Sequence, residues 1–165
     1  MDVIPDALVE ETWQEMVSWS DEDVRRLMKR IARTQGPLVV FVMTLTEHLS
    51  ADARQLALYL FAMIQRMFWK TPGHVRRARP TEIEAAYERN LEFLSRLENA
   101  DERFLEGAAD SMDLSQPFVM KYLVEALIEA PEEDDPIVLS EEEAGELFLI
   151  LKTVIDTLDK ISHLR

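Results

Sequence analysis

The chain has 165 residues, of which 47% are apolar and none is cysteine. It is therefore long enough to form one domain with a substantial core, and disulfides, thiolate zinc sites and cysteine nucleophiles are excluded. The net charge of −14 is unevenly spread, because residues 1–80 carry 10 acidic and 11 basic side chains while residues 81–165 carry 22 and 7. A net field of this sign disfavours nucleic acids and anionic membranes as partners.

The start of the chain has neither the basic nor the apolar segment of a secretory signal. The longest apolar run, Leu56–Ile64, is much shorter than the roughly 20 residues that span a bilayer. We therefore expect a soluble, cytoplasmic protein with no membrane partner.

Helix signals recur along the whole chain. Apolar residues repeat at three- and four-residue steps, and capping residues or prolines precede these runs. Thr81 with Glu84, and Ser140 with Glu143, have the spacing of a capping box. The expected helices begin near Pro5, Ser20, Pro37, Ser50, Thr81, Asp101, Ser115 and Ser140.

The segment Leu38–Leu45 is rich in β-branched residues and is compatible with a short buried strand. No second segment of this kind offers a partner strand, so we predict a helix. In Leu56–Ile64 and Leu147–Leu151 the apolar residues surround the helix, which is typical of centrally buried helices. We expect the two central helices over 50–69 and 140–162.

These signals predict an all-α fold of about eight antiparallel helices in a single domain, 1–165. A second interpretation divides the chain into two tandem four-helix units, 1–71 and 80–163, joined by a basic linker and packed around the two central helices. Pro37 and Pro117 each open an apolar helix, and a Leu-Ser pair precedes each central helix. The identities are few, so both interpretations stay open.

No catalytic, metal or cofactor site is predicted. His48, His74 and His163 lack the spacing of a metal site, and the serines at helix starts are explained as caps. The acidic run 132–135 lacks the pattern of a calcium loop. Three carboxylates near apolar stripes would be informative if they were buried in a pocket, because burial shifts their pKa. These are Glu47, Glu125 and Asp156.

Two basic clusters are the candidates for binding an anionic group or a partner. Arg25, Lys29 and Arg33 form a stripe along the second predicted helix, which we call the basic stripe. Arg76, Arg77 and Arg79 lie in the linker that joins the two halves. An alternative role is to pair with acidic helices of the second half, within the chain or across a homodimer.

The sequence favours a non-catalytic protein–protein interaction or adaptor module, whose partner is another protein or a second copy. The eight methionines are compatible with a groove for a partner helix, although methionines also fill cores. One alternative is a small-ligand binding protein or enzyme with an apolar pocket between helices. Another is a nucleic-acid-associated protein that uses the basic linker, which the net charge disfavours.

Overall fold

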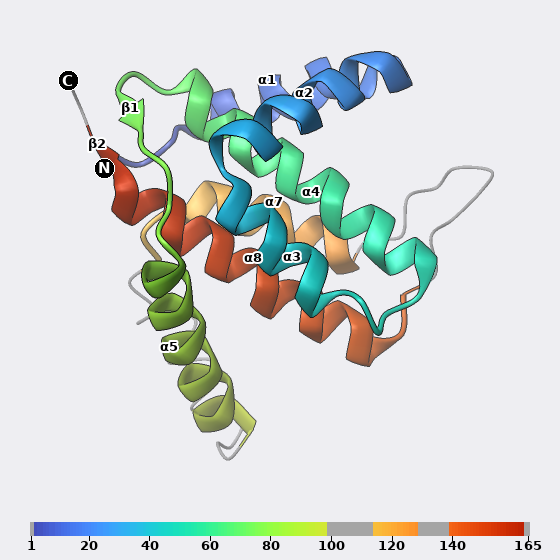
Figure 1. Cartoon of the computed structure of the whole chain (residues 1–165), viewed down its shortest axis with the longest axis vertical. Helices are drawn as coiled ribbons and strands as arrows, with labels where there is room; N and C mark the ends of the chain where they lie inside the picture. The colour runs from blue at the N-terminus through green and yellow to red at the C-terminus, as the bar shows by residue number, and fades with distance from the viewer. Residues whose placement is uncertain (1, 99–113, 129–138, 164–165) are drawn as a thin grey trace.

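The computed structural model describes residues 2–98, 114–128 and 139–163 (Figure 1). These residues are mostly helical, which confirms the all-α class. The sixth expected helix and the acidic run 132–135 lie outside the described residues. The described elements are α1 (Asp6–Val17), α2 (Asp21–Thr34), α3 (Gly36–Leu45), α4 (Ala51–Lys70), β1 (His74–Val75), α5 (Pro80–Glu98), α7 (Pro117–Ile128), α8 (Glu141–Ile161) and β2 (Ser162–His163).

The segment that was compatible with a strand is the helix α3. Pro37 lies in its first turn, where a missing N–H costs nothing. The buried residues of α3 are Leu38 and Val42, four positions apart. In a strand Val40 would share the face of Leu38 and Val42, but it is 64% exposed. Burial therefore follows the helical period and not the alternation of a strand.

The start of α5 differs from the sequence prediction. The helix begins at Pro80, and the carboxylate of Glu82 accepts a hydrogen bond of 2.9 Å from the Arg79 backbone N–H. Glu82 thus caps the start of α5, a role that the sequence prediction assigned to Glu84. Glu84 is left exposed on the helix surface.

The two central helices, α4 and α8, match the expected positions but run parallel to each other (Figure 1). One carboxylate joins their N-terminal ends. The Glu143 carboxylate accepts a 3.1 Å hydrogen bond from the Ser50 backbone N–H and a 2.7 Å bond from the Ser50 hydroxyl. It also accepts hydrogen bonds of 3.4 Å from the backbone N–H and the hydroxyl of Ser140. Beyond their C-terminal ends, β1 pairs with β2.

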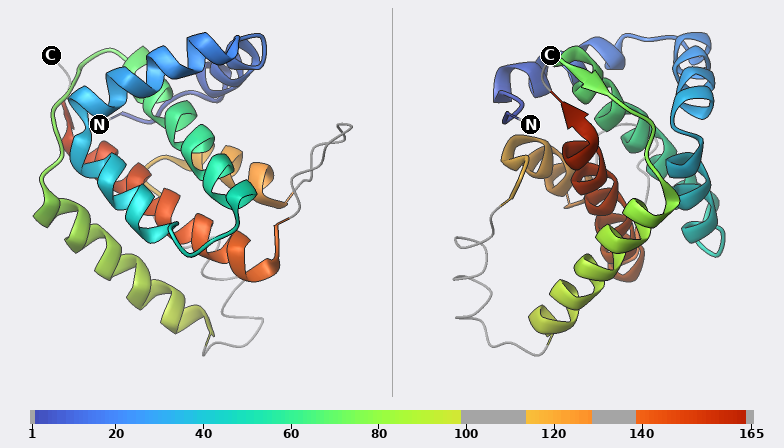
Figure 2. Two further views of the ribbon diagram at one scale, coloured as in Figure 1. Left: turned by 45° about the vertical axis from the view of Figure 1, so that its right-hand side comes forward. Right: turned by 60° about the vertical axis from the view of Figure 1, so that its left-hand side comes forward.

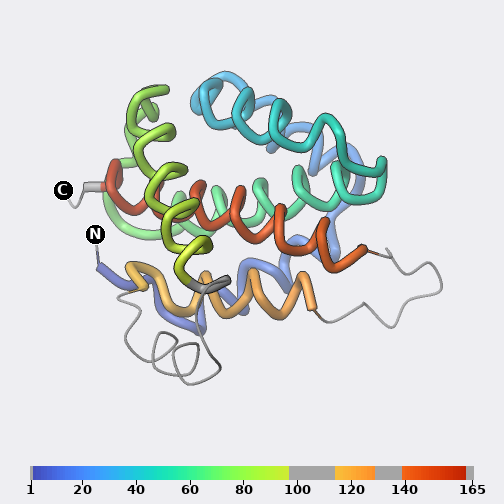
Figure 3. Tube along the Cα trace, turned by 90° about the horizontal axis from the view of Figure 1, so that it is seen from below, coloured from blue at the N-terminus to red at the C-terminus, as the bar shows by residue number. Residues whose placement is uncertain are grey.

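The helices form three layers, with α4 and α8 in the middle. Figure 3 shows α1 and α7 on one side of this pair, and α3 and α5 on the other. Helix α2 packs on α3 and α4. Figure 2 shows that α3 and α5 run in the same general direction along the outer face.

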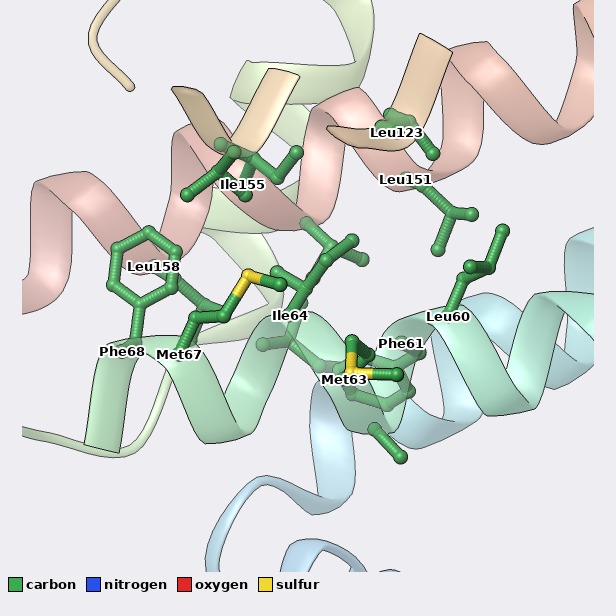
Figure 4. Close-up of a cluster of buried hydrophobic side chains, with 14 of the residues drawn as sticks. Leu60, Phe61, Met63, Ile64, Met67, Phe68, Leu123, Leu151, Ile155 and Leu158 are labelled. Atoms are coloured by element: carbon green, nitrogen blue, oxygen red, sulfur yellow. The ribbon is translucent and has the colours of Figure 1, made fainter. Parts of the chain in front are cut away.

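The core lies between the middle helices. Leu60 and Ile64 of α4 point towards Leu151 and Ile155 of α8, and Leu123 of α7 lies on the far side of α8 (Figure 4). All five side chains are buried. Full burial of a large apolar side chain contributes roughly 1.5–3 kcal/mol, so this cluster stabilises the packing of α4, α7 and α8.

Candidate functional site

A buried glutamine positions α3 next to the start of α5. Gln35 directly precedes α3, and its side-chain amide donates a 2.7 Å hydrogen bond to the Arg76 carbonyl and accepts one of 3.0 Å from the Ala78 N–H. Buried amides of this kind need partners, and here both partners are backbone groups of the linker. The linker is therefore held beside the first turn of α3.

A groove of about 630 Å³ opens between α3 and α5. The rings of Phe41 on α3 and Tyr87 on α5 both line the groove and meet edge to face, with centroids 5.6 Å apart. Most of its lining is apolar, and its charged residues are Arg77 and Glu84. The lining residues are Gly36, Pro37, Val40, Phe41, Thr44, Leu45, Arg77, Pro80, Ile83, Glu84 and Tyr87.

The groove lies within a larger exposed apolar face of α3. Val40 is 64% exposed although it lines the groove, and Met43, one turn further on, is 56% exposed outside it. We call the groove together with these two side chains the α3–α5 face. Contiguous exposed apolar surface on a folded protein usually marks a binding surface.

Arg77 lies at one end of this groove. Its guanidinium donates a 3.2 Å hydrogen bond to the carbonyl of Arg33, at the last turn of α2. It also packs over Gly36, since a Cβ at that position would lie 2.9 Å from Arg77 Nη2. The structure thus brings the linker and the end of the basic stripe together at the N-terminus of α3.

The other basic residues divide into paired and unpaired groups. Arg76 donates two hydrogen bonds to the Glu82 carboxylate. These bonds are the main cause that lowers the pKa of Glu82 to about 2, and the hydrogen bond from the Arg79 N–H is the second. Arg25, Lys29 and Arg33 are exposed and form no ion pair with any described residue. No described acidic helix of the second half therefore neutralises the basic stripe.

The three carboxylates singled out by the sequence do not line the groove. Glu47 and Glu125 are exposed. Asp156 is partly buried between α5 and α8, where it accepts hydrogen bonds from Lys152 at 2.7 Å and from Asn90 at 3.1 Å. Its role is to hold α5 against α8.

The histidines show no arrangement for metal binding. His48 Nε2 lies 2.7 Å from a Glu146 oxygen, and the backbones of His74 and His163 pair in the short sheet. Across the described ranges, no group of three potential ligands is close enough to hold a metal ion.

Sequence reasoning did not identify the apolar residues of the α3–α5 face. One signal could have found them. Helix α3 has apolar side chains on nearly every side, but it is only ten residues long and lies outside the two central helices. A peripheral helix of this composition must leave apolar surface exposed unless a partner covers it.

No helix in the described part of the chain is long and apolar enough to cross a membrane. No protein-family model matches the chain, and no curated protein or solved structure shows significant similarity to it.

Proposed function

We propose that this protein is a non-catalytic interaction module that binds a helix of a protein partner on the α3–α5 face. The observation that carries this proposal is the apolar groove bordered by the exposed Val40 and Met43. An apolar helix laid into a groove is a common mode of recognition. Helix α3 is about 15 Å long at 1.5 Å per residue, which suits two to three turns of a docked helix.

The charges around the groove indicate an acidic group at one end of the partner helix. Arg77 has no carboxylate partner among the described residues, and the basic stripe ends beside it at Arg33. Helix α3 also lacks an acidic residue in its first turn and a side-chain cap. A carboxylate from outside would complement both the guanidinium and the positive end of the helix dipole.

A small apolar ligand is the second candidate, because 630 Å³ is within the usual size range of ligand pockets. Such a ligand would leave Met43 exposed, since Met43 lies outside the groove. A docked helix would cover both Met43 and the groove. We therefore prefer the protein partner.

We also infer that the chain consists of two tandem four-helix units, 1–71 and 80–163. Two glutamine side chains with equivalent hydrogen bonds support this inference. Gln116 directly precedes α7 as Gln35 directly precedes α3. The Gln116 side-chain amide accepts a 2.8 Å hydrogen bond from the Ile4 N–H and donates one of 3.1 Å to the Asp2 carbonyl. Ile4 and Asp2 lie two and four positions before α1, just as Ala78 and Arg76 lie two and four positions before α5. In this arrangement the pair of helices α1 and α7 corresponds to the pair α5 and α3.

Photo-cross-linking in the cells of origin tests the proposed function. A photoreactive phenylalanine analogue is placed at position 43, and at position 17 as a control, because Val17 is 64% exposed on α1 and lies outside the groove. We expect a cross-link from position 43 to one helix of one protein, mapped by mass spectrometry. The substitution Val40→Glu should abolish this cross-link, because a charge would enter the apolar contact.

Absence of any protein cross-link specific to position 43 would overturn the proposed function. Equal cross-linking from positions 43 and 17 would overturn it as well, since it would indicate non-specific contact.

A further inference from the structure

We propose that the helix bound on the α3–α5 face is α3 of a second copy of this chain, in antiparallel orientation. This inference rests on the proposed function of the face. It makes the protein a symmetric dimer in which the same residues serve as groove and as ligand.

The register follows from the exposed residues of α3. Val40 and Met43 are three positions apart and so lie on the same side of the helix. A two-fold axis midway between them places Val40 of each copy opposite Met43 of the other. Each of these side chains is more than half exposed in the single chain, so the pairing removes apolar surface from water on both copies.

The same axis brings opposite charges together at both ends. It places Gly36 of one copy opposite Glu47 of the other, because these two positions are equally far along the sequence from the midpoint between Val40 and Met43. The Arg77 guanidinium lies over Gly36, and Glu47 is exposed and forms no ion pair with any described residue. Arg77 and Glu47 therefore meet twice in one dimer.

The helix dipoles favour this orientation as well. Antiparallel α3 helices place the N-terminal end of each beside the C-terminal end of the other. A parallel arrangement would bring the two Arg77 side chains together and separate each from Glu47. Charge complementarity thus selects the antiparallel pair.

The contact is small, because α3 has only ten residues and α5 contributes only the groove wall. Specific interfaces usually bury about 800 Å² on each partner. The net charge of −14 on each copy also opposes association. We therefore expect a dimer of micromolar affinity that forms readily only at moderate ionic strength, where distant charges are screened.

Sedimentation equilibrium of the purified full chain tests the dimer. At about 0.15 M salt, the wild type should convert from monomer to dimer as its concentration rises through the micromolar range. Val40→Glu should raise the dimer dissociation constant at least about tenfold. Val17→Glu is the matched control, because both valines are 64% exposed, and it should leave the constant unchanged.

Charge exchange tests the register. Arg77→Glu and Glu47→Arg should each weaken the dimer, because each places like charges opposite one another. The double variant should restore dimerisation, since the pair is re-formed with reversed signs. A structural role for Arg77 alone would not produce this rescue.

A monomer at all accessible concentrations would overturn the dimer, as would a wild-type dimer that Val40→Glu does not weaken. Failure of the double variant to recover would overturn the register. A position-43 cross-link to a different protein would also overturn the dimer but would support the proposed function, so the two proposals can fail separately.

Discussion

The core of this protein contains one polar side chain whose replacement should increase stability. Gln65 lies in α4 and is fully buried, and neither its amide nitrogen nor its amide oxygen has a hydrogen-bond partner in the described part of the chain. A buried polar group without a partner costs about 1–3 kcal/mol. Methionine has nearly the same shape and lacks both polar atoms, so Gln65→Met removes the cost without leaving a cavity.

We expect Gln65→Met to raise the free energy of unfolding by about 1–3 kcal/mol. For a chain of this size, the melting temperature should rise by about 2–4 °C for each kcal/mol. Urea unfolding followed by far-UV circular dichroism measures the change directly. The slope of the unfolding free energy against urea should stay constant, because the surface exposed on unfolding hardly changes.

Gln55→Met is the matched control, because Gln55 lies on the same helix but is exposed. Its effect should stay within about 0.5 kcal/mol, as for most surface substitutions. A loss of stability in Gln65→Met with no change in Gln55→Met would refute the reasoning. It would show that the Gln65 amide is satisfied in solution, for example by a buried water.

Three further predictions concern the core, acid stability and nucleic acids. Leu60→Ala should lower the free energy of unfolding by about 2–5 kcal/mol, as measured by urea unfolding. The loss for Leu149→Ala should lie at the lower end of this range, because the Leu149 side chain is still 8% exposed. The pKa of Glu82 is about 2 in the folded chain, so its contribution to stability is complete above about pH 4.5 and is lost as the pH falls towards 2. Glu82→Gln should therefore reduce the free energy of unfolding at neutral pH and make its decrease at acid pH less steep. Glu84→Gln is the control and should do neither, because Glu84 forms no such hydrogen bonds with the described residues. Fluorescence anisotropy should show no micromolar binding of short DNA or RNA near physiological salt, and tighter binding would contradict the preference for a protein partner.

The sequence predicted the class and the central helices because both depend on local patterns. Caps and apolar periodicity set where α4 and α8 begin and how they are buried. Their parallel orientation could not be predicted, because it depends on long-range contacts. Ser50 and Glu143 are 93 positions apart, and nothing in the neighbourhood of either residue indicates that they meet.

The candidate site was predicted only in part. The sequence identified both basic clusters, but it could not show that Arg77 reaches the end of α2 while Arg76 is occupied by Glu82. The groove itself is a gap between helices that are distant in sequence. The buried Gln35 amide and the ring contact at Tyr87 hold the linker and α5 beside α3, and both are contacts between residues that are distant in sequence.

The distribution of charge connects the fold to the proposed function. The ion pairs among the described residues mostly join helices or stabilise helix starts. For example, Glu15 of α1 forms ion pairs with both Arg66 and Lys70 of α4. Charges used in this way are unavailable to a partner. Arg77 and Glu47, which form no ion pair with any residue that the structure describes, lie instead at opposite ends of the exposed apolar stretch of α3. A surface with apolar residues at its centre and opposite charges at its ends is complementary to its own two-fold copy. This self-complementarity is the reason for proposing a second α3 as the occupant of the face in preference to a ligand that carries only one charge.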